Sequence, residues 1–525
     1  MRRAVSLIAI AATLAIPSAA AASWHPTGSG SGYSRADALS GGNTPTTSVS
    51  GRNVTVNWTA TSGNVPVTGY VVKRYDASSG VQQTIGSGCS GTVAGTTCTE
   101  AAVSPGSWKY SVTPARQNWR GSESTKSSAT TVGSPALSLS TTTITCRPGT
   151  LSGTITNFIT GHSVTFHLDS PAGTTLSGST TPSTIPTNGQ ASVSVTIPTT
   201  VTGGSHTVYV VDSGDTATSP SASFTVDALR VATGTYTGNG TSQTITGLGF
   251  QPDAVIDKAA TNSGAAVMST TTMGTNATKP LAGATAPTTG MITSLSAPTN
   301  GFSVGNNAAT NANGKAYYWT AFKWIGDSGI GSYTGNGTAG HAITGLGFSP
   351  DYLIGLGNVA QPAAERMSPS TRTYSFDKTG NATLGGTRVT NGFTSLDTNG
   401  FTLGTNGAVN NTGTTNYYAA FNQCASQMTT GSYTGTNATQ QVSGAGFTPS
   451  FLTIRGDDTG TARDGVMRNA ALTGSETQLF SATADNTTNM ITSLSVPTSG
   501  FTVGNNAATG ANGVTYDYAA FKDLP

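Results

Sequence analysis

The chain has 525 residues, too many for one hydrophobic core, so we expect several domains. Charged residues make up only 9% of it, against 35% apolar residues and 67 glycines, and the formal net charge is +2. Nucleic acid and anionic lipid both need clustered Lys and Arg, so this charge excludes them as partners. Thr, Ser, Asn and Gly replace the charged residues, which is typical of short strands joined by turns. We therefore predict an all-β fold of tandem β-sandwich modules.

Residues 1–22 have the layout of a secretory signal peptide. Arg2 and Arg3 precede a mostly apolar run from Ala4 to Ile16, and small residues near the end offer a cleavage site. The run is shorter than the ~20 residues needed to span a membrane. We therefore expect a mature protein that is secreted or loosely held at the cell surface, without membrane insertion.

The first module follows a Gly/Ser-rich stretch, residues 23–44, which predicts a flexible lead-in. One face of "NVTVNWTA" is apolar, and "TGYVVKRYD" and "GSWKYSVTPARQNWRG" have the same strand character. Over residues 45–132 this pattern resembles a fibronectin type III domain. The resemblance implies a two-sheet sandwich whose core contains aromatic residues at Trp58, Tyr70 and Tyr110.

The second module covers residues 135–228 and begins at Pro135, which would break a strand. Its segments "SVTFHLDS", "QASVSVTIP", "GSHTVYVVD" and "SASFTVD" alternate between apolar and polar residues. The spacing resembles that of the bacterial Ig-like modules of surface proteins, and implies another sandwich.

The rest of the chain contains three copies of one unit, at residues 232–326, 329–424 and 429–525. The phrase "GFSVGNNAAT" at Gly301 returns as "GFTVGNNAAT" at Gly500. Equivalent aromatic residues are 97 to 100 positions apart, too long a period for a solenoid. We therefore expect three domains in series. The marker aromatics are Tyr236, Tyr333 and Tyr433; Phe250, Phe348 and Phe447; Phe302, Phe401 and Phe501; and Phe322, Phe421 and Phe521.

The last strand of each unit is apolar on both faces. In "AYYWTAFKW", Thr320 and Phe322 point one way, whereas Trp319 and Ala321 point the other, which predicts a central strand. The pattern "YTGNG … GLGFxPD … GFxVG … YxAF" resembles repeat domains of phage tails and bacterial surface proteins. Its second half also resembles the H-type lectin plan, a small antiparallel sandwich that is often trimeric. This resemblance implies jelly-roll or lectin-like sandwiches and makes a homotrimer one option.

Aromatic residues shared by all three units are predicted to lie in the core, because aromatics carry much of a β core. Those not shared are the candidates for exposed platforms that stack on sugars, namely Tyr317, Trp324 and Tyr516. Asp253 and Asp351 follow a proline in two units, but the third has Ser450 there. This difference favours a turn-capping role for the aspartates over a ligand role.

Four cysteines are present, and an oxidising compartment favours their pairing. Cys89 and Cys98 are close in sequence and predict a local disulfide. Cys146 and Cys424 are each alone, and the sequence leaves them three options: to pair with each other, to pair between chains, or to stay reduced.

The segment "RGDDTGTARDG" in the third unit is a charged loop. Its carboxylates, Asp457, Asp458 and Asp464, make a weak calcium candidate because the order of ligands in an EF-hand is absent. It also contains the tripeptide "RGD", which integrins read. Solvation of the loop is the favoured interpretation, with calcium second and integrin third.

Catalysis is not indicated by any motif. The histidines have no repeated Ser, Cys or carboxylate beside them, and no pair of carboxylates can be nominated for glycoside hydrolysis. His162 and His167 are five residues apart, which puts them on opposite faces of a strand and excludes a shared metal ion. We expect a non-enzymatic protein without a cofactor.

Three functions fit these features. The leading hypothesis is adhesion to cell-surface or extracellular glycans, which predicts exposed aromatics on loops at one end of each unit. A structural shaft or filament predicts an apolar patch on the flank of every unit. The third is an accessory module of a secreted polysaccharide-degrading system.

Overall fold

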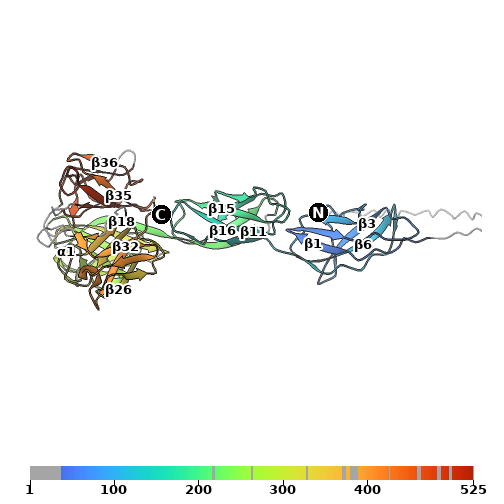
Figure 1. The fold of residues 1–525 in the computed structure, drawn as a ribbon, viewed down its shortest axis with the longest axis horizontal. Helices are drawn as coiled ribbons and strands as arrows, with labels where there is room; N and C mark the ends of the chain where they lie inside the picture. The colour runs from blue at the N-terminus through green and yellow to red at the C-terminus, as the bar shows by residue number, and fades with distance from the viewer. Residues whose placement is uncertain are drawn as a thin grey trace, which may run out of the picture.

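The computed structural model describes residues 37–523, apart from residues 216–218, 262–263, 327–328, 369–373, 379–387, 425, 458–462, 482–485 and 496–498. The predicted signal peptide and residues 23–36 lie outside the described residues. Strands dominate, and the helices in the described parts are short: η1 (Thr271–Met273), α1 (Ala308–Asn311) and α2 (Gly407–Asn410). The prediction of an all-β fold with tandem sandwiches is confirmed, and Figure 1 shows two sandwiches leading to a larger head.

The first sandwich pairs a sheet of order β1-β2-β5 with a sheet of order β4-β3-β6-β7, in which β8 also pairs with β6. Its strands are β1 (Thr46–Ser50), β2 (Asn53–Asn57), β3 (Gly69–Asp76), β4 (Gln82–Gln83), β5 (Thr97–Glu100), β6 (Gly106–Arg116), β7 (Trp119–Arg120) and β8 (Thr130–Val132). Trp58 is buried and meets Tyr70 edge-on, with ring centroids 5.3 Å apart. Tyr110 is fully buried. These contacts and the strand order agree with the predicted fibronectin type III-like sandwich.

The lead-in differs from its prediction where it is described. Leu39 is buried, and the backbone N–H of Gly42 donates to the carbonyl of Ser122 at 3.0 Å. Residues 37–44 therefore pack on the first sandwich, because an apolar side chain within the Gly/Ser-rich stretch finds a place in its surface.

The second sandwich has an Ig-like pair of sheets, β14-β15-β11-β9 and β10-β17-β16-β12-β13. Strand β15 alternates strictly between buried and exposed residues, and its buried side faces the core. The strands are β9 (Ala136–Leu139), β10 (Thr143–Ile144), β11 (Gly149–Thr156), β12 (Val164–Leu168), β13 (Thr175–Leu176), β14 (Gly178–Thr181), β15 (Ala191–Ile197), β16 (Gly204–Asp212) and β17 (Ser221–Val226).

Each repeat is a sandwich of one large and one small sheet. The large sheets are β18-β25-β20-β21-β22, β26-β34-β28-β29-β30-β31 and β35-β42-β37-β38-β39, and the small ones are β19-β24-β23, β27-β33-β32 and β36-β41-β40. The last strands, β25, β34 and β42, have a partner on each side, so the prediction of a central strand is confirmed.

The strands of the first repeat are β18 (Ala228–Thr237), β19 (Gln243–Thr246), β20 (Ala254–Ala259), β21 (Val267–Thr270), β22 (Lys279–Pro280), β23 (Ile292–Ser294), β24 (Gly301–Val304) and β25 (Ala316–Ile325). Those of the second are β26 (Ile330–Thr334), β27 (His341–Thr344), β28 (Tyr352–Leu356), β29 (Ala364–Met367), β30 (Tyr374–Asp377), β31 (Arg388–Thr390), β32 (Phe393–Asp397), β33 (Gly400–Leu403) and β34 (Thr415–Phe421). Those of the third are β35 (Met428–Thr434), β36 (Gln440–Val442), β37 (Phe451–Asp457), β38 (Val466–Asn469), β39 (Gln478–Leu479), β40 (Ile491–Ser493), β41 (Phe501–Val503) and β42 (Thr515–Phe521).

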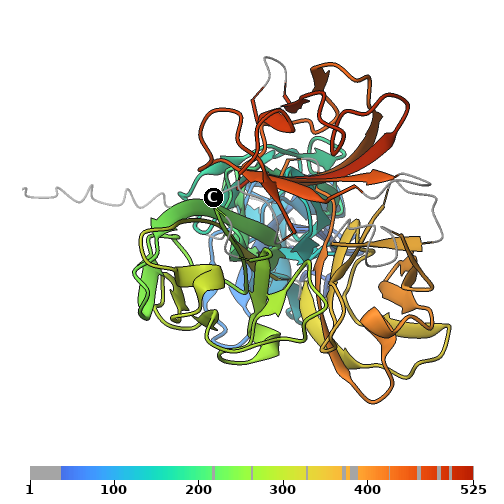
Figure 2. The same cartoon turned by 90° about the vertical axis from the view of Figure 1, so that its left-hand side faces the viewer.

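The three repeats pack around one another, as Figure 2 shows in green, yellow-orange and red. Their large sheets enclose a single shared core with residues from all three repeats. At its centre lie Phe322, Phe421 and Phe521, whose ring centroids are 5.0 to 5.5 Å apart in edge-on pairs. Each repeat also keeps a core between its own two sheets. The expected series of three domains is therefore one head with a common interior.

Hydrogen bonds cross the seams between the repeats. The N–H of Ala266 donates to the carbonyl of Phe480 at 3.0 Å, and the N–H of Ala363 donates to the carbonyl of Leu281 at 2.9 Å. Buried cations lie at the same seams: Lys258 Nζ donates to the Ser481 carbonyl at 3.0 Å, Lys279 Nζ to the Val359 carbonyl at 2.8 Å, and Arg455 pairs with Asp377 at 3.5 Å. The seams thus give these buried cations polar partners from the neighbouring repeat.

The head is joined to the second sandwich by both the chain and a disulfide. Asp227 alone separates β17 from β18. Cys146 in the second sandwich is bonded to Cys424, the last residue of the second repeat. Cys89 and Cys98 form the predicted local disulfide. Among the options left open for Cys146 and Cys424, the structure therefore has the pair within one chain.

The phenylalanine cluster generates the first prediction. Phe421→Ala should lower the free energy of unfolding of the head by about 3–5 kcal/mol, because it opens a cavity where three repeats meet. Urea unfolding measures this. Val81→Ala is the control, because Val81 is 57% exposed and its truncation should change little. A loss below about 1 kcal/mol for Phe421→Ala would contradict the shared core.

The two disulfides generate the second prediction. They close loops with sequence separations of 9 and 278 residues. Chain entropy predicts a loss of about 3 kcal/mol for Cys89→Ser with Cys98→Ser, and of about 5–6 kcal/mol for Cys146→Ser with Cys424→Ser. Thermal unfolding of both double variants tests the order. Equal effects would show that the long loop is already constrained without its disulfide.

Candidate functional site

The tyrosines predicted to be exposed lie in the interior. Tyr317 and Tyr516 are both fully buried, so the expectation that they stack on sugars from the surface is wrong. The Tyr317 hydroxyl donates to the carbonyl of Ala308 at 2.7 Å and accepts from the N–H of Ala312 at 2.7 Å. Tyr516 does the same with the equivalent loop. Each tyrosine hydroxyl thus holds a loop of its own repeat in place. The middle repeat has Asn416 at the equivalent position.

Trp324 lies at the seam between the first two repeats. Its indole N–H donates to the carbonyl of Ala420 at 3.1 Å, and its ring packs 5.0 Å from that of Phe421. It lines a cavity of about 40 Å³ near the second sandwich, with Asp227 and Gln427 among the other lining residues. Such a cavity has room for water but not for a sugar ring, so Trp324 is also not an exposed platform.

Other exposed aromatics were expected on the loops of the repeats. Across the described ranges, the large apolar side chains that are exposed are Val49, Val81 and Trp119, all in the first sandwich. The apolar flank expected of a structural shaft is present on every repeat, but the neighbouring repeats cover it.

The charged loop of the third repeat does not present its tripeptide. Arg455 is fully buried in β37 and pairs with Asp377, so a partner could not read "RGD" here. Asp464 is half-buried, and burial raises the pKa of its carboxyl. Asp458 and the side chain of Asp457 lie outside the described residues. In the part of the chain that the structure describes, no three His, Cys, Asp or Glu side chains gather as metal ligands would.

The two aspartates predicted to cap turns accept hydrogen bonds from the end of the last strand of their repeat. Asp253 Oδ2 accepts from the N–H of Trp324 at 3.0 Å, and Asp351 Oδ2 accepts from the N–H of Gln423 at 2.7 Å. Both therefore hold the chain where it leaves the last strand of a repeat.

The histidines of the second sandwich have separate partners. His162 Nδ1 lies 2.6 Å from Asp212 Oδ1. His167 contacts the hydroxyl of Thr165 and the carbonyl of Gly173. They share no ligand.

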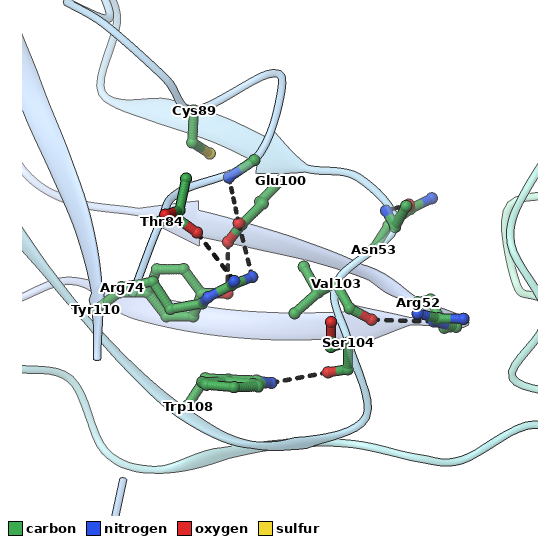
Figure 3. A network of polar contacts seen from close by, with 12 residues as sticks. Arg52, Asn53, Arg74, Thr84, Cys89, Glu100, Val103, Ser104, Trp108 and Tyr110 are labelled. Carbon is green, nitrogen blue, oxygen red and sulfur yellow. Dashed lines mark hydrogen bonds and ion pairs between the residues drawn. The ribbon is translucent and has the colours of Figure 1, made fainter. Parts of the chain in front are cut away.

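Figure 3 shows a buried polar network in the first sandwich. The carboxylate of Glu100, which is fully buried, accepts from Arg74 at 2.7 Å and from the Tyr110 hydroxyl at 2.8 Å. Arg74 also lies over the Trp108 ring, 4.7 Å from its centroid. Arg74 fully compensates the buried charge, so this network stabilises the sandwich and presents no reactive group.

The end of the head farthest from the first two sandwiches, which we call the stalk, carries the loops that the repeated phrase encodes. Strands β18, β26 and β35 lead away from the second sandwich, and Figure 2 looks onto the ends they reach. In the first repeat, Asn307 caps α1 by accepting from the N–H of Ala309 at 2.9 Å. The buried Asn311 donates to the carbonyl of Gly305 at 2.6 Å and to Asn239 at 3.2 Å. The phrase thus encodes a capped loop, which the buried Asn311 directly after it holds in place.

The second repeat keeps this geometry, with Asn406 as the cap and Asn410 as the buried donor. The third keeps the cap, Asn506, but has Gly510 at the position of the buried asparagine. We call these three loop sets the distal face. Exposed on it are the uncharged side chains of Asn306, Asn313, Thr405, Thr412, Asn505 and Asn512, and one cationic residue, Lys315. The uncharged side chains combine donors and acceptors, as hydroxyl-rich ligands require.

A buried acid lies beneath the distal face of the first repeat. Asp257 is fully buried, and its Oδ2 lies 2.7 Å from the hydroxyl of Tyr236, which is itself 2.5 Å from the carbonyl of Thr310. The single phenolic proton can serve only one of these acceptors, so a protonated Asp257 completes the chain of hydrogen bonds. Burial raises the pKa of the Asp257 carboxyl to about 8. The equivalent residues, Gly355 and Ile454, carry no charge.

In the described parts of the chain, no helix is long and apolar enough to cross a membrane. Two disulfides are the kind of bond that forms in oxidising compartments.

One family model matches part of the chain. A model for a domain of unknown function, DUF7483, matches residues 229–332, which is the first repeat. No curated protein matches the chain.

Solved structures of tandem β-modules are similar to the chain. A tetra-tandem repeat in the extending region of a large adhesion protein has 14% identity, covers 63% of this chain and 88% of its own, and gives a TM-score of 0.22. The FN1–FN3 domains of chicken CNTN1 have 10% identity, 55% and 95% coverage and a TM-score of 0.18. Titin kinase with its flanking domains has 11% identity and a TM-score of 0.17, and the match covers 39% of this chain and 31% of titin's. Scores this low do not establish a shared overall arrangement.

Asp257 generates the third prediction. A carboxyl with a pKa near 3.8 when unfolded and about 8 when folded contributes stability that is full below pH 3.8 and is lost as the pH rises towards 8. Asp257→Asn should remove this loss and make the head more stable at pH 8 than the wild type, by roughly 1–3 kcal/mol. Unfolding midpoints from pH 4 to 8 measure it.

The control is Asp76→Asn, because hydrogen bonds from Ser79 and Ser78 lower the pKa of this exposed carboxyl to about 2. This variant should leave the pH dependence above pH 4 unchanged. Parallel wild-type and Asp257→Asn curves would show that Asp257 is ionised in the folded head.

Proposed function

We propose that this is a non-catalytic, secreted surface protein in which a two-sandwich stalk presents an adhesive head to neutral extracellular or cell-surface glycans. The observation that carries this is the fusion of three repeats into one head whose distal face points away from the stalk (Figure 1). The stalk and head are also bonded through Cys146 and Cys424, which fixes the head on its support.

The chemistry of the distal face supports a neutral glycan as the ligand. Its exposed amides and hydroxyls, such as those of Asn306 and Thr405, are uncharged and match sugar hydroxyls. Three similar loop sets on one rigid head allow weak contacts to act together, which raises the apparent affinity by effective concentration. The aromatic platforms first expected are not part of this proposal.

The same geometry supports a proposal on the oligomeric state. The apolar flanks that would join three chains are already covered by sibling repeats. We therefore propose that the intact protein is a monomer whose threefold arrangement is internal. Light scattering should give the mass of one chain, and a trimeric mass would favour the structural-shaft hypothesis.

The fourth prediction tests glycan binding. A glycan array probed with the intact mature protein should show binding to neutral glycans. The double variant Asn313→Ala with Asn512→Ala should lower the apparent affinity for the strongest of these by about tenfold or more, because two of the three loop sets are altered. Asn64→Ala is the matched control, since Asn64 is an exposed asparagine in the first sandwich. An array without specific binding, or an unchanged affinity in the double variant, would overturn the proposal.

A further inference from the structure

The hairpin between β6 and β7 carries an unusual surface tryptophan. Trp119 is 62% exposed and is the one aromatic among the large apolar side chains that are exposed within the described ranges. Tryptophan is usually well buried because its ring is large and apolar. It lies at the tip of a tight hairpin, where Trp119 pairs with Arg116 across the strands.

Polar and cationic residues neighbour Trp119 in the hairpin. Arg120 Nη1 donates to the carbonyl of Gln117 at 2.7 Å and to that of Trp119 at 2.9 Å, which holds the guanidinium against the backbone of the turn. Gln117 and Asn118 are exposed at the turn, and Gln117 has a left-handed backbone with φ of 50°. The tip thus presents an aromatic face, two amides and two guanidinium groups.

The hairpin is held firmly at its base. The N–H of Gly121 donates to the carbonyl of Pro114 at 2.9 Å, and the lead-in packs alongside through Gly42 and Ser122. A platform that is already ordered loses little conformational entropy when it binds.

The charge of the tip is uncompensated. Neither Arg116 nor Arg120 forms an ion pair with a carboxylate of the residues described. Glu123, the nearest acidic residue in sequence, is engaged by Lys73 at 2.8 Å and by Ser111 at 2.5 Å. The hairpin therefore favours an anionic ligand.

We propose that the hairpin of residues 116–120 binds acidic polysaccharide. The Trp119 ring stacks on the apolar face of a sugar ring, while Arg116 and Arg120 pair with carboxylates of the same chain and the amides bind hydroxyls. This site lies on the first sandwich, at the other end of the molecule from the head (Figure 1), so it does not rest on the proposed function of the distal face. The protein then carries two binding ends of different chemistry, one for anionic and one for neutral polymers.

Affinity electrophoresis of the full mature protein through gels containing polygalacturonate tests this, with dextran gels as the neutral comparison. Polygalacturonate should retard the wild type, and retardation should weaken with added salt because the guanidinium–carboxylate pairs are screened. Trp119→Ala, and Arg116→Gln with Arg120→Gln, should each weaken binding by about tenfold. Melting temperatures close to wild type would show that these exposed changes leave the fold intact.

The matched controls are Lys126→Gln, which removes an exposed positive charge elsewhere on the same sandwich, and Val81→Ala, which removes an exposed apolar side chain. Both should bind like the wild type. Full retardation of Trp119→Ala, or a loss for Lys126→Gln as large as that for the arginine variant, would overturn the proposal. Vesicles of anionic phospholipid should not bind through Trp119, and equal binding to them would identify a lipid surface instead.

Discussion

The burial of one apolar face on each repeat determines the architecture of the head. A strand such as β25 has two apolar faces, and its own sandwich can cover only the one that bears Trp319 and Ala321. The other face, with Phe322, would stay in water unless another surface met it. The sibling repeats supply that surface, and the three phenylalanines meet on the axis between them. The seams, the buried cations and the position of the distal loops all follow from this contact.

The repeats differ at some of the positions where they meet. Ala254, Tyr352 and Phe451 occupy equivalent positions beside the phenylalanine ring, so small and large side chains complement one another. In the second repeat, Lys378 Nζ contacts Glu365 and donates to the Tyr352 hydroxyl, and it also lies 3.9 Å from the centroid of the Phe480 ring of the third. Burial lowers the pKa of this lysine, while the carboxylate opposes that shift. Arg455 of the third repeat pairs with Asp377 of the second, so these two repeats cannot exchange places without separating a buried pair of charges.

Sequence patterns predicted the strands, the sandwich modules, the local disulfide and the two-faced last strand, because alternation and spacing report burial directly. They could not identify what covers a buried face, because the sequence pattern around Phe322 is the same whether another chain or the next repeat packs on it. Absence from one repeat also proved a poor sign of exposure, since Tyr317 and Tyr516 are buried where the middle repeat has Asn416. Trp119 was missed because it stands in a strand-like stretch, and only the register of its hairpin shows that it lies at an exposed tip.

The bond between Cys146 and Cys424 sets the route by which tension travels. A pull on the two ends of the chain passes from the second sandwich across the sulfurs and directly into the third repeat. The backbone between the two cysteines, which includes the first and second repeats, forms a closed covalent loop and carries no load along its length. Of the three repeats, only the third lies outside the loop and can be drawn out by such a pull. A head that grips a surface in flow would therefore keep two of its three repeats mechanically sheltered for as long as that bond is oxidised.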